Sequence, residues 1–334
     1  MNGKKTLPPQ QLKEADYAQV RESIEEMFFE LIFEPLAKAV AKTNEKTAEI
    51  VREFRNTDSG THSALLVALR TGAVQYTSGV FSGSFSRHIS AALRSIGATF
   101  DRREGVYRLA DSQIPVDVRA AALTYEGMAK GAHDVVLQKL NEAQERVASF
   151  VRDYDLSAEA AVDAVAEGFK KSAEQLEVMP QLTPESLAVL EEEYTENLKL
   201  YIQGFMEHEI VRLRREVEDN ARAGYRFDRL AKIVKEHTKV SQYKAEFLAR
   251  QETALFMSEF RRRNFAEAGV TRYIWKTSKD QRVRDSHAHL DGKVFFYNDP
   301  PIVDAARGRR ANPGQDYNCR CIDVPVLDPV KIGD

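Results

Sequence analysis

The clearest indication of the fold class comes from residues Thr183–Gly224. This stretch reads TPESLAVLEEEYTENLKLYIQGFMEHEIVRLRREVEDNARAG. Thr183 and Pro184 predict a helix start, because threonine is a good N-cap and proline fits the first helical position. Apolar residues then recur every three or four positions and predict one buried face: Leu187, Leu190, Tyr194, Leu198, Tyr201, Phe205, Leu213 and Val217. Gly224 suits the helix end. The pattern predicts a helix of about 40 residues, about 60 Å long, as in a bundle or an elongated protein.

Helical periodicity also appears on both sides of this stretch. It covers residues 17–56, 59–71, 116–152, 157–175 and 241–268. Pro35 predicts either a kink or a division into two helices within the first of these segments, because proline lacks the backbone N–H that a helix interior needs. The sequence therefore predicts a mainly α protein with an elongated helical body over residues 17–240.

Composition excludes several classes of protein. The 334 residues are 43% hydrophobic and 30% charged, and the low counts of Gly 17 and Pro 11 exclude collagen-like and low-complexity chains. No apolar run is long enough for a membrane span, and a net charge of −3 does not indicate nucleic-acid binding. Cys319 and Cys321 cannot form a disulfide scaffold, so we expect a reducing compartment. Residues 1–16 are polar and predict a flexible arm without a secretory signal.

The helical pattern is interrupted at about residues 72–115, where the composition changes. Gly72, Gly79 and Gly83 alternate with Val, Tyr and Phe, and a short helix is expected around Ser86–Ile96. Thr99–Phe100 and Val106–Leu109 predict a β-hairpin with Gly105 in its turn. We expect a small α+β insertion here.

The C-terminal residues 241–334 predict a loop-rich α+β module. Thr271–Thr277 and Val294–Tyr297 are expected to be strands, while prolines break up the remainder. The module contains an ordered set of special residues: Trp275, Asp280, Arg282, Arg284, His287, Leu290, Asp291, Gly292, Pro313, Asn318, Cys319, Arg320 and Cys321.

This ordered set resembles the phage Mu F-like minor head proteins, also called head morphogenesis proteins of tailed bacteriophages. The resemblance covers about 95 residues at the C-terminus, including Arg250–Thr253. It implies a virion component inside the head near the portal vertex, made in the host cytoplasm. It also implies partners among the portal, capsid or scaffold proteins and packaged DNA, a role in head assembly or in DNA packaging, retention or ejection, and no established catalytic mechanism.

The residues themselves indicate a metal site. His287, Cys319 and Cys321 carry the ligand atoms of a tetrahedral zinc site. If the segment around His287 is helical, His289 is rotated away, and Asp280, Asp291 or water would be the fourth ligand. The alternative is a pair of reduced, partly buried cysteines with His287 hydrogen-bonded to the backbone.

Two further sets of residues have structural and functional interpretations. Asp280, Arg282 and Arg284 suggest an active site beside His287, but Arg–carboxylate pairs also fix loop-rich folds. Asp291-Gly292 fits a turn. Arg307, Arg309 and Arg310 lie in a loop without an acid between Asp304 and Asp316, so they are the better candidates for DNA phosphates than the clusters at 212–215 and 261–263.

Three functions remain open from the sequence. The leading hypothesis is a non-enzymatic phage head protein without membrane contact. The second is a metal-assisted hydrolase or nuclease that uses the His287, Cys319 and Cys321 cluster, and the third is a zinc-stapled DNA-binding module. No nucleophile motif, P-loop or dinucleotide fingerprint is present, so we expect no catalytic residues.

Overall fold

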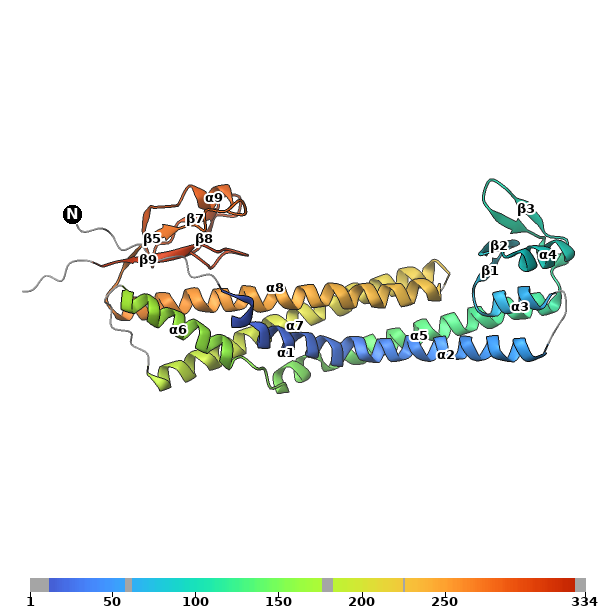
Figure 1. Ribbon diagram of the computed structural model, residues 1–334, viewed down its shortest axis with the longest axis horizontal. Helices are drawn as coiled ribbons and strands as arrows, with labels where there is room; N and C mark the ends of the chain where they lie inside the picture. The colour runs from blue at the N-terminus through green and yellow to red at the C-terminus, as the bar shows by residue number, and fades with distance from the viewer. Residues whose placement is uncertain (1–11, 58–61, 176–182, 225, 328–334) are drawn as a thin grey trace, which may run out of the picture. The chain divides into compact units, whose positions relative to one another are not determined.

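The structure, a computed structural model, describes residues 12–57, 62–175, 183–224 and 226–327. These residues are mainly helical with small antiparallel sheets, including a C-terminal α+β region, as the sequence predicts (Figure 1). The chain divides into two compact units. Unit 1 comprises Met1–Met27, Ser149–Phe205 and Ser241–Asp334, and unit 2 comprises Phe28–Ala148 and Met206–Val240. Within the described ranges, no helix is long and apolar enough to cross a membrane.

The elements follow one another along the chain from α1 to β9. The helices are α1 (Ala18–Phe28), α2 (Glu34–Thr57), α3 (Ser63–Arg70), α4 (Arg87–Ser95), α5 (Val116–Asp153), α6 (Glu159–Gln175), α7 (Pro184–Arg222), α8 (Phe227–Glu267) and α9 (Asp285–Ala288). The strands are β1 (Val74–Thr77), β2 (Val80–Gly83), β3 (Thr99–Asp101), β4 (Val106–Arg108), β5 (Arg272–Lys276), β6 (Val294–Phe296), β7 (Ile302–Asp304), β8 (Arg309–Arg310) and β9 (Ile322–Val326). Short 3-10 helices occupy Glu14–Asp16 and Asp111–Gln113. Most of the predicted flexible arm lies outside the described residues.

The predicted kink at Pro35 takes the form of a π-helical turn. Phe29–Phe33 form this turn between α1 and α2, immediately before Glu34-Pro35. Proline cannot donate the usual hydrogen bond, and its ring clashes with the carbonyl four residues earlier. A wider turn is one way to relieve that clash within a continuing helix.

The long helix α7 begins where the sequence predicts. The backbone N–H of Ser186 donates to Thr183 Oγ1 over 3.2 Å, which is the expected N-cap bond. One predicted face residue is wrong, because Tyr201 is 50% exposed, and two others, Leu187 and Phe205, are only partly buried. Ile202 and Met206 are fully buried in their place, because steps of four from Leu198 keep the stripe on one face.

Helix α8 corrects the predicted start near Ser241. It begins at Phe227, and the predicted boundary at 240/241, where the two compact units also divide, lies within this continuous helix. Buried polar residues hid the periodicity: His237 and Ser241 occupy positions where an apolar side chain is expected. His237 is satisfied there by Glu209 of α7, with 2.6 Å between His237 Nδ1 and Glu209 Oε1.

The insertion in unit 2 is a four-stranded antiparallel sheet with strand order β1-β2-β4-β3. The predicted β3–β4 hairpin and the short helix α4 are confirmed. The glycine-rich stretch before them forms a second hairpin, β1–β2, in which Thr77 pairs with Val80. Ser78 and Gly79 make its two-residue turn with φ of 48° and 84°, the left-handed geometry that favours a tight hairpin.

The C-terminal sheet in unit 1 has β5 at its centre, between β6 and β9. Tyr273 and Trp275 are two positions apart on β5, so they lie on the same face of the sheet, and both are fully buried. The predicted strands at 271–277 and 294–297 are confirmed as β5 and β6. Strand β9 was not expected, because Pro325 lies within it. As an edge strand, β9 can carry a proline.

Candidate metal centre

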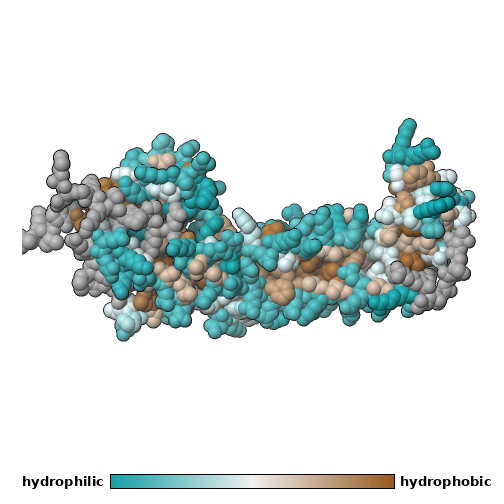
Figure 2. Space-filling view, in the orientation of Figure 1, coloured by the Kyte–Doolittle hydropathy of each residue, from teal (hydrophilic) through white to brown (hydrophobic). Residues whose placement is uncertain are grey.

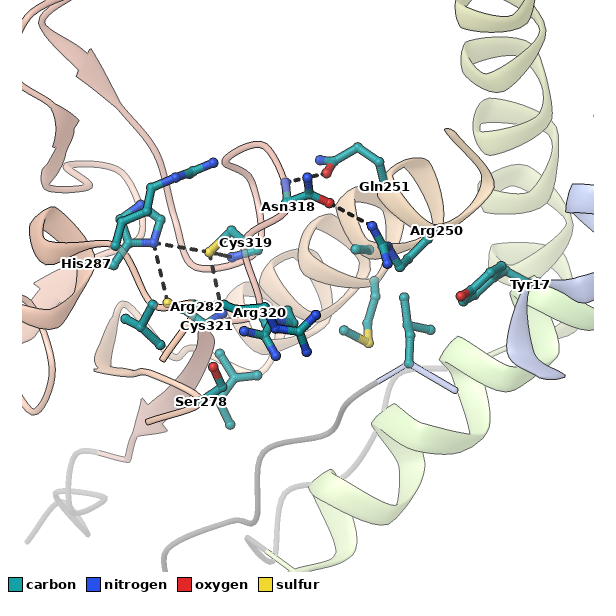
Figure 3. Close-up of a pocket in the computed structure, with 17 residues that line it drawn as sticks. Tyr17, Arg250, Gln251, Ser278, Arg282, His287, Asn318, Cys319, Arg320 and Cys321 are labelled. Atoms are coloured by element: carbon teal, nitrogen blue, oxygen red, sulfur yellow. Dashed lines mark hydrogen bonds between the residues drawn. The ribbon is translucent and has the colours of Figure 1, made fainter. Parts of the chain in front are cut away.

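Two short segments of the C-terminal sheet region bring the predicted cluster together. α9 carries His287, and the loop before β9 carries Cys319 and Cys321. Asn318, with φ of 51°, turns this loop. Helix α8 anchors the turn, because the Asn318 N–H donates to Gln251 Oε1 over 2.6 Å and Arg250 donates to Asn318 Oδ1 over 3.0 Å. All three cluster residues are buried (Figure 3).

The three ligand atoms have the spacing of a metal site. His287 Nδ1 lies 3.6 Å from Cys319 Sγ and 3.6 Å from Cys321 Sγ, and all three atoms lie within 4.8 Å of one another. A tetrahedral zinc ion, with one nitrogen at about 2.0 Å and sulfurs at about 2.3 Å, separates N and S by about 3.5–3.6 Å. The cluster could therefore hold a metal.

A carboxylate fixes the orientation of the His287 ring. His287 Nε2 lies 3.1 Å from Asp316 Oδ2, so a proton on Nε2 donates to Asp316 and leaves Nδ1 free for the sulfurs. Asp316 is itself held by Arg284 at 2.7 Å and by Arg309. Trp275 packs edge-on against the ring, with centroids 5.4 Å apart. This arrangement matches the carboxylate–histidine support of many metal sites.

The electrostatics favour a thiolate at Cys319. The adjacent Cys321 thiol, followed by His287, lowers the pKa of Cys319 to about 5 despite burial. The backbone N–H groups of Gly314 and Cys321 also donate to Cys319 Sγ, each over 3.4 Å. The contact with Cys319 raises the pKa of His287, and the same neighbour raises the pKa of Cys321 well above its usual range. These shifts favour the thiolate form of Cys319, which is the form that binds a metal.

The cluster lies in the wall of a cleft of about 480 Å³. α8 contributes Arg250 and Gln251, and the loops before α9 and β9 contribute Arg282 and Arg320. Figure 3 shows these residues around the opening, with His287 bonded to both sulfurs.

The other predicted ligands are engaged by other residues. Asp280 pairs with Arg320, which lowers the pKa of its carboxyl to about 2. Asp291 accepts hydrogen bonds from the backbone and hydroxyl of Thr277 at 2.8 and 3.1 Å, in the turn that Gly292 completes with φ of 80°. His289 is exposed on α9, as expected for a residue two positions after His287. His287 bonds to side chains rather than to the backbone that the alternative interpretation required.

The three arginines predicted as DNA contacts all have acidic partners. Arg307 pairs with Asp304 at 3.1 Å, and Arg310 pairs with Asp299 at 2.6 Å. Arg309 pairs with Asp316 and lies 5.1 Å from the ring of Tyr317. The acids that flank this loop in sequence therefore fold back onto it.

Two important residues were not singled out from the sequence. Asp316 orients the histidine, and Asp323 forms a second buried network, with Arg261 Nη2 at 3.2 Å and the Tyr297 hydroxyl at 2.6 Å. Asp316 lies between Pro313 and Asn318 of the ordered set, so its position was a usable signal. Asp323 had none.

Comparison with known proteins identifies this part of the chain. Residues 211–323, about a third of the chain, match the family model "Phage Mu protein F like protein". An uncharacterized protein of Haemophilus influenzae is 37% identical over 99 residues, which are 30% of this chain and 21% of that protein. The chain thus spans about a fifth of the length of this curated relative. No solved structure matches. The matched residues include all of the cluster and both buried networks, so residues 211–323 form a phage Mu protein F-like domain.

Proposed function

We propose that the protein is a minor head protein of a tailed bacteriophage. The match of residues 211–323 to the Mu protein F-like family carries this proposal, because membership in that family implies a role in head morphogenesis. In detail, the protein acts at the portal vertex inside the virion head after assembly in the host cytoplasm. Its partners are the portal and the capsid or scaffold proteins, and it affects the packaging, retention or ejection of DNA.

We further propose that the cluster holds a structural zinc ion. The ligand spacing, the lowered pKa of Cys319 and the Asp316 support all favour zinc over two free thiols. His287 lies 32 residues before Cys319, so the ion would join α9 to the loop before β9. Bound zinc would supply a cross-link in a region with few apolar residues.

The absence of catalysis is part of this proposal. Asp280, Asp291 and Asp316, the carboxylates around the cluster, are engaged by Arg320, Thr277 and Arg284 respectively, so none of them is a free general base. Ser286 adjoins His287 on α9, where neighbouring side chains do not face each other. The rival is a metal-assisted hydrolase or nuclease, and the open cleft beside a three-ligand cluster favours it.

Quantitative mass spectrometry of purified phage particles tests this function. We expect the protein in particles at a few copies per portal. Deletion of its gene should reduce the yield of DNA-filled heads, and His287→Ala should reduce particle incorporation, whereas the exposed neighbour variant His289→Ala should not. Absence from particles, together with normal head yield after deletion, would contradict the proposal. Normal assembly by His287→Ala with loss of a measurable nuclease activity would favour the enzyme.

A further inference from the structure

The cleft beside the cluster has a strongly one-sided charge. Its described lining contains no aspartate or glutamate, but it contains the arginines Arg250, Arg282, Arg284 and Arg320. Its volume of about 480 Å³ falls within the range of about 300–1,000 Å³ that is usual for small-molecule sites. A concave surface with this charge selects an anion.

Two of these arginines are not neutralised. Arg284 pairs with Asp316, and Arg320 pairs with Asp280. In contrast, no described carboxylate lies within 4.0 Å of the guanidinium groups of Arg250 and Arg282. Arg250 donates to the neutral amide oxygen of Asn318. Two positive charges from separate elements therefore line one cleft without a carboxylate partner.

We propose that this cleft binds a phosphate group between Arg250 and Arg282. A phosphate carries a charge of about −1.5 to −2 at neutral pH, so it matches two free guanidinium groups better than a carboxylate does. A guanidinium group can also donate two hydrogen bonds to one phosphate group. Arginines on different sides of the cleft permit this. Ser278 and Asn318 line the same cleft and add neutral polar groups (Figure 3).

This site shares its cleft with the zinc cluster but uses other residues, and it is distinct from the arginine loop that the sequence indicated. Neither Arg250 nor Arg282 is a cluster residue, so phosphate binding does not require the metal. Arg307, Arg309 and Arg310 are already paired with acids, whereas Arg250 and Arg282 have no carboxylate partner among the described residues.

Isothermal titration calorimetry of the full chain with inorganic phosphate tests the proposal. We expect saturable binding that Arg282→Gln and Arg250→Gln each weaken about tenfold or more, as loss of a charged hydrogen bond implies. Arg307→Gln, a matched change of an exposed arginine outside the cleft, should leave the affinity within about twofold. The fluorescence of Trp275, the chain's one tryptophan, gives a second readout because this residue packs against His287.

Three further binding experiments determine which class of anion binds and where its phosphate comes from. Acetate at equal ionic strength should bind more weakly than phosphate, and preferential acetate binding would overturn the proposal. Short duplex DNA that binds through Arg282 would identify nucleic-acid phosphate as the source, and binding of inorganic phosphate alone would identify a free phosphate ligand. Absence of any phosphate binding, or binding that Arg282→Gln does not weaken, overturns the proposal. Titrations with and without a zinc chelator separate this result from the fate of the zinc proposal.

Discussion

Residues 72–115 and residues 272–326 each build a small antiparallel sheet with a short helix, but their interiors differ in chemistry. The first region packs Val74, Phe81, Leu93 and other apolar side chains into one core. The second buries Trp275 and Tyr273 together with His287, Asp316 and Asp323. Burying ionisable groups costs solvation free energy unless they are paired, so their presence here marks the region that supports a specific site. An apolar core supports only the fold.

The largest expected effects compare one residue from each interior. Phe81→Ala should destabilise the insertion by about 3–5 kcal/mol, because it leaves a cavity. Asp323→Ala should destabilise the C-terminal sheet by about 3–5 kcal/mol, because it leaves the buried Arg261 unpaired. Hydrogen exchange with mass spectrometry on the full chain measures each region separately.

Partial rescue distinguishes the two mechanisms. Phe81→Leu should recover much of the loss in the insertion, since it restores volume. Adding Arg261→Met to Asp323→Ala should recover much of the loss in the C-terminal sheet, since it removes the unpaired charge. If Asp323→Ala alone leaves exchange in residues 272–326 unchanged, the contrast between the two interiors is wrong.

Metal removal should affect only one of the two regions. We expect one equivalent of zinc after desalting, and zinc at a hundred times its dissociation constant should stabilise the C-terminal region by about 2.7 kcal/mol. This stabilisation should be lost, and the fluorescence of Trp275 should change, on addition of a chelator or in the variants Cys319→Ser and Cys321→Ser. The insertion should keep its protection against hydrogen exchange. His289→Ala is the matched control, because this histidine is exposed.

Elemental analysis decides whether the cluster holds zinc. Protein purified without chelator and found free of zinc would favour two buried thiols instead. In that case His287→Gln should retain more stability than His287→Ala, because glutamine still bonds to Asp316.

The last expected effect is a pH dependence from Glu252 of α8. Burial raises the pKa of this carboxyl from 4.5 to about 7. Between these two pH values the carboxyl is therefore mostly protonated in the folded protein and mostly ionised in the unfolded chain. A raised carboxyl pKa means that its contribution to stability falls as pH rises from about 4.5 to about 7. Glu252→Gln should flatten the stability profile in this window, measured by thermal unfolding. An unchanged profile would show that Glu252 is solvated.

The helices were predictable because their apolar residues follow a regular period. Leu190, Tyr194 and Leu198 set the face of α7, and Thr183-Pro184 set its start. Prediction failed where polar residues replace apolar ones in the interior, as at His237 in α8. It also failed at β9, because Pro325 is acceptable only at a sheet edge, and sequence does not reveal which strand is an edge.

The cluster was predictable from residue types, but its supporting contacts were not. His287, Cys319 and Cys321 are rare residues with metal-ligand chemistry, so they stand out in sequence. Asp316, Arg284 and Arg309 are common residues whose pairing depends on loops that meet only after folding. For the same reason, the pairing of Arg310 with Asp299 was not visible in sequence, whereas Asp304 lies only three residues before its partner Arg307.

The burial of Arg261 against Asp323 also affects how the chain is completed during synthesis. Arg261 lies in α8, and its partner is translated 62 residues later. At about 5–20 residues per second, a ribosome leaves this arginine unpaired for several seconds, and β5 without β9 for much of that time. Strand β5 can pair with β9 only after residues 322–326 have been made, so a ribosome stalled before residue 322 would leave a strand edge exposed to other chains.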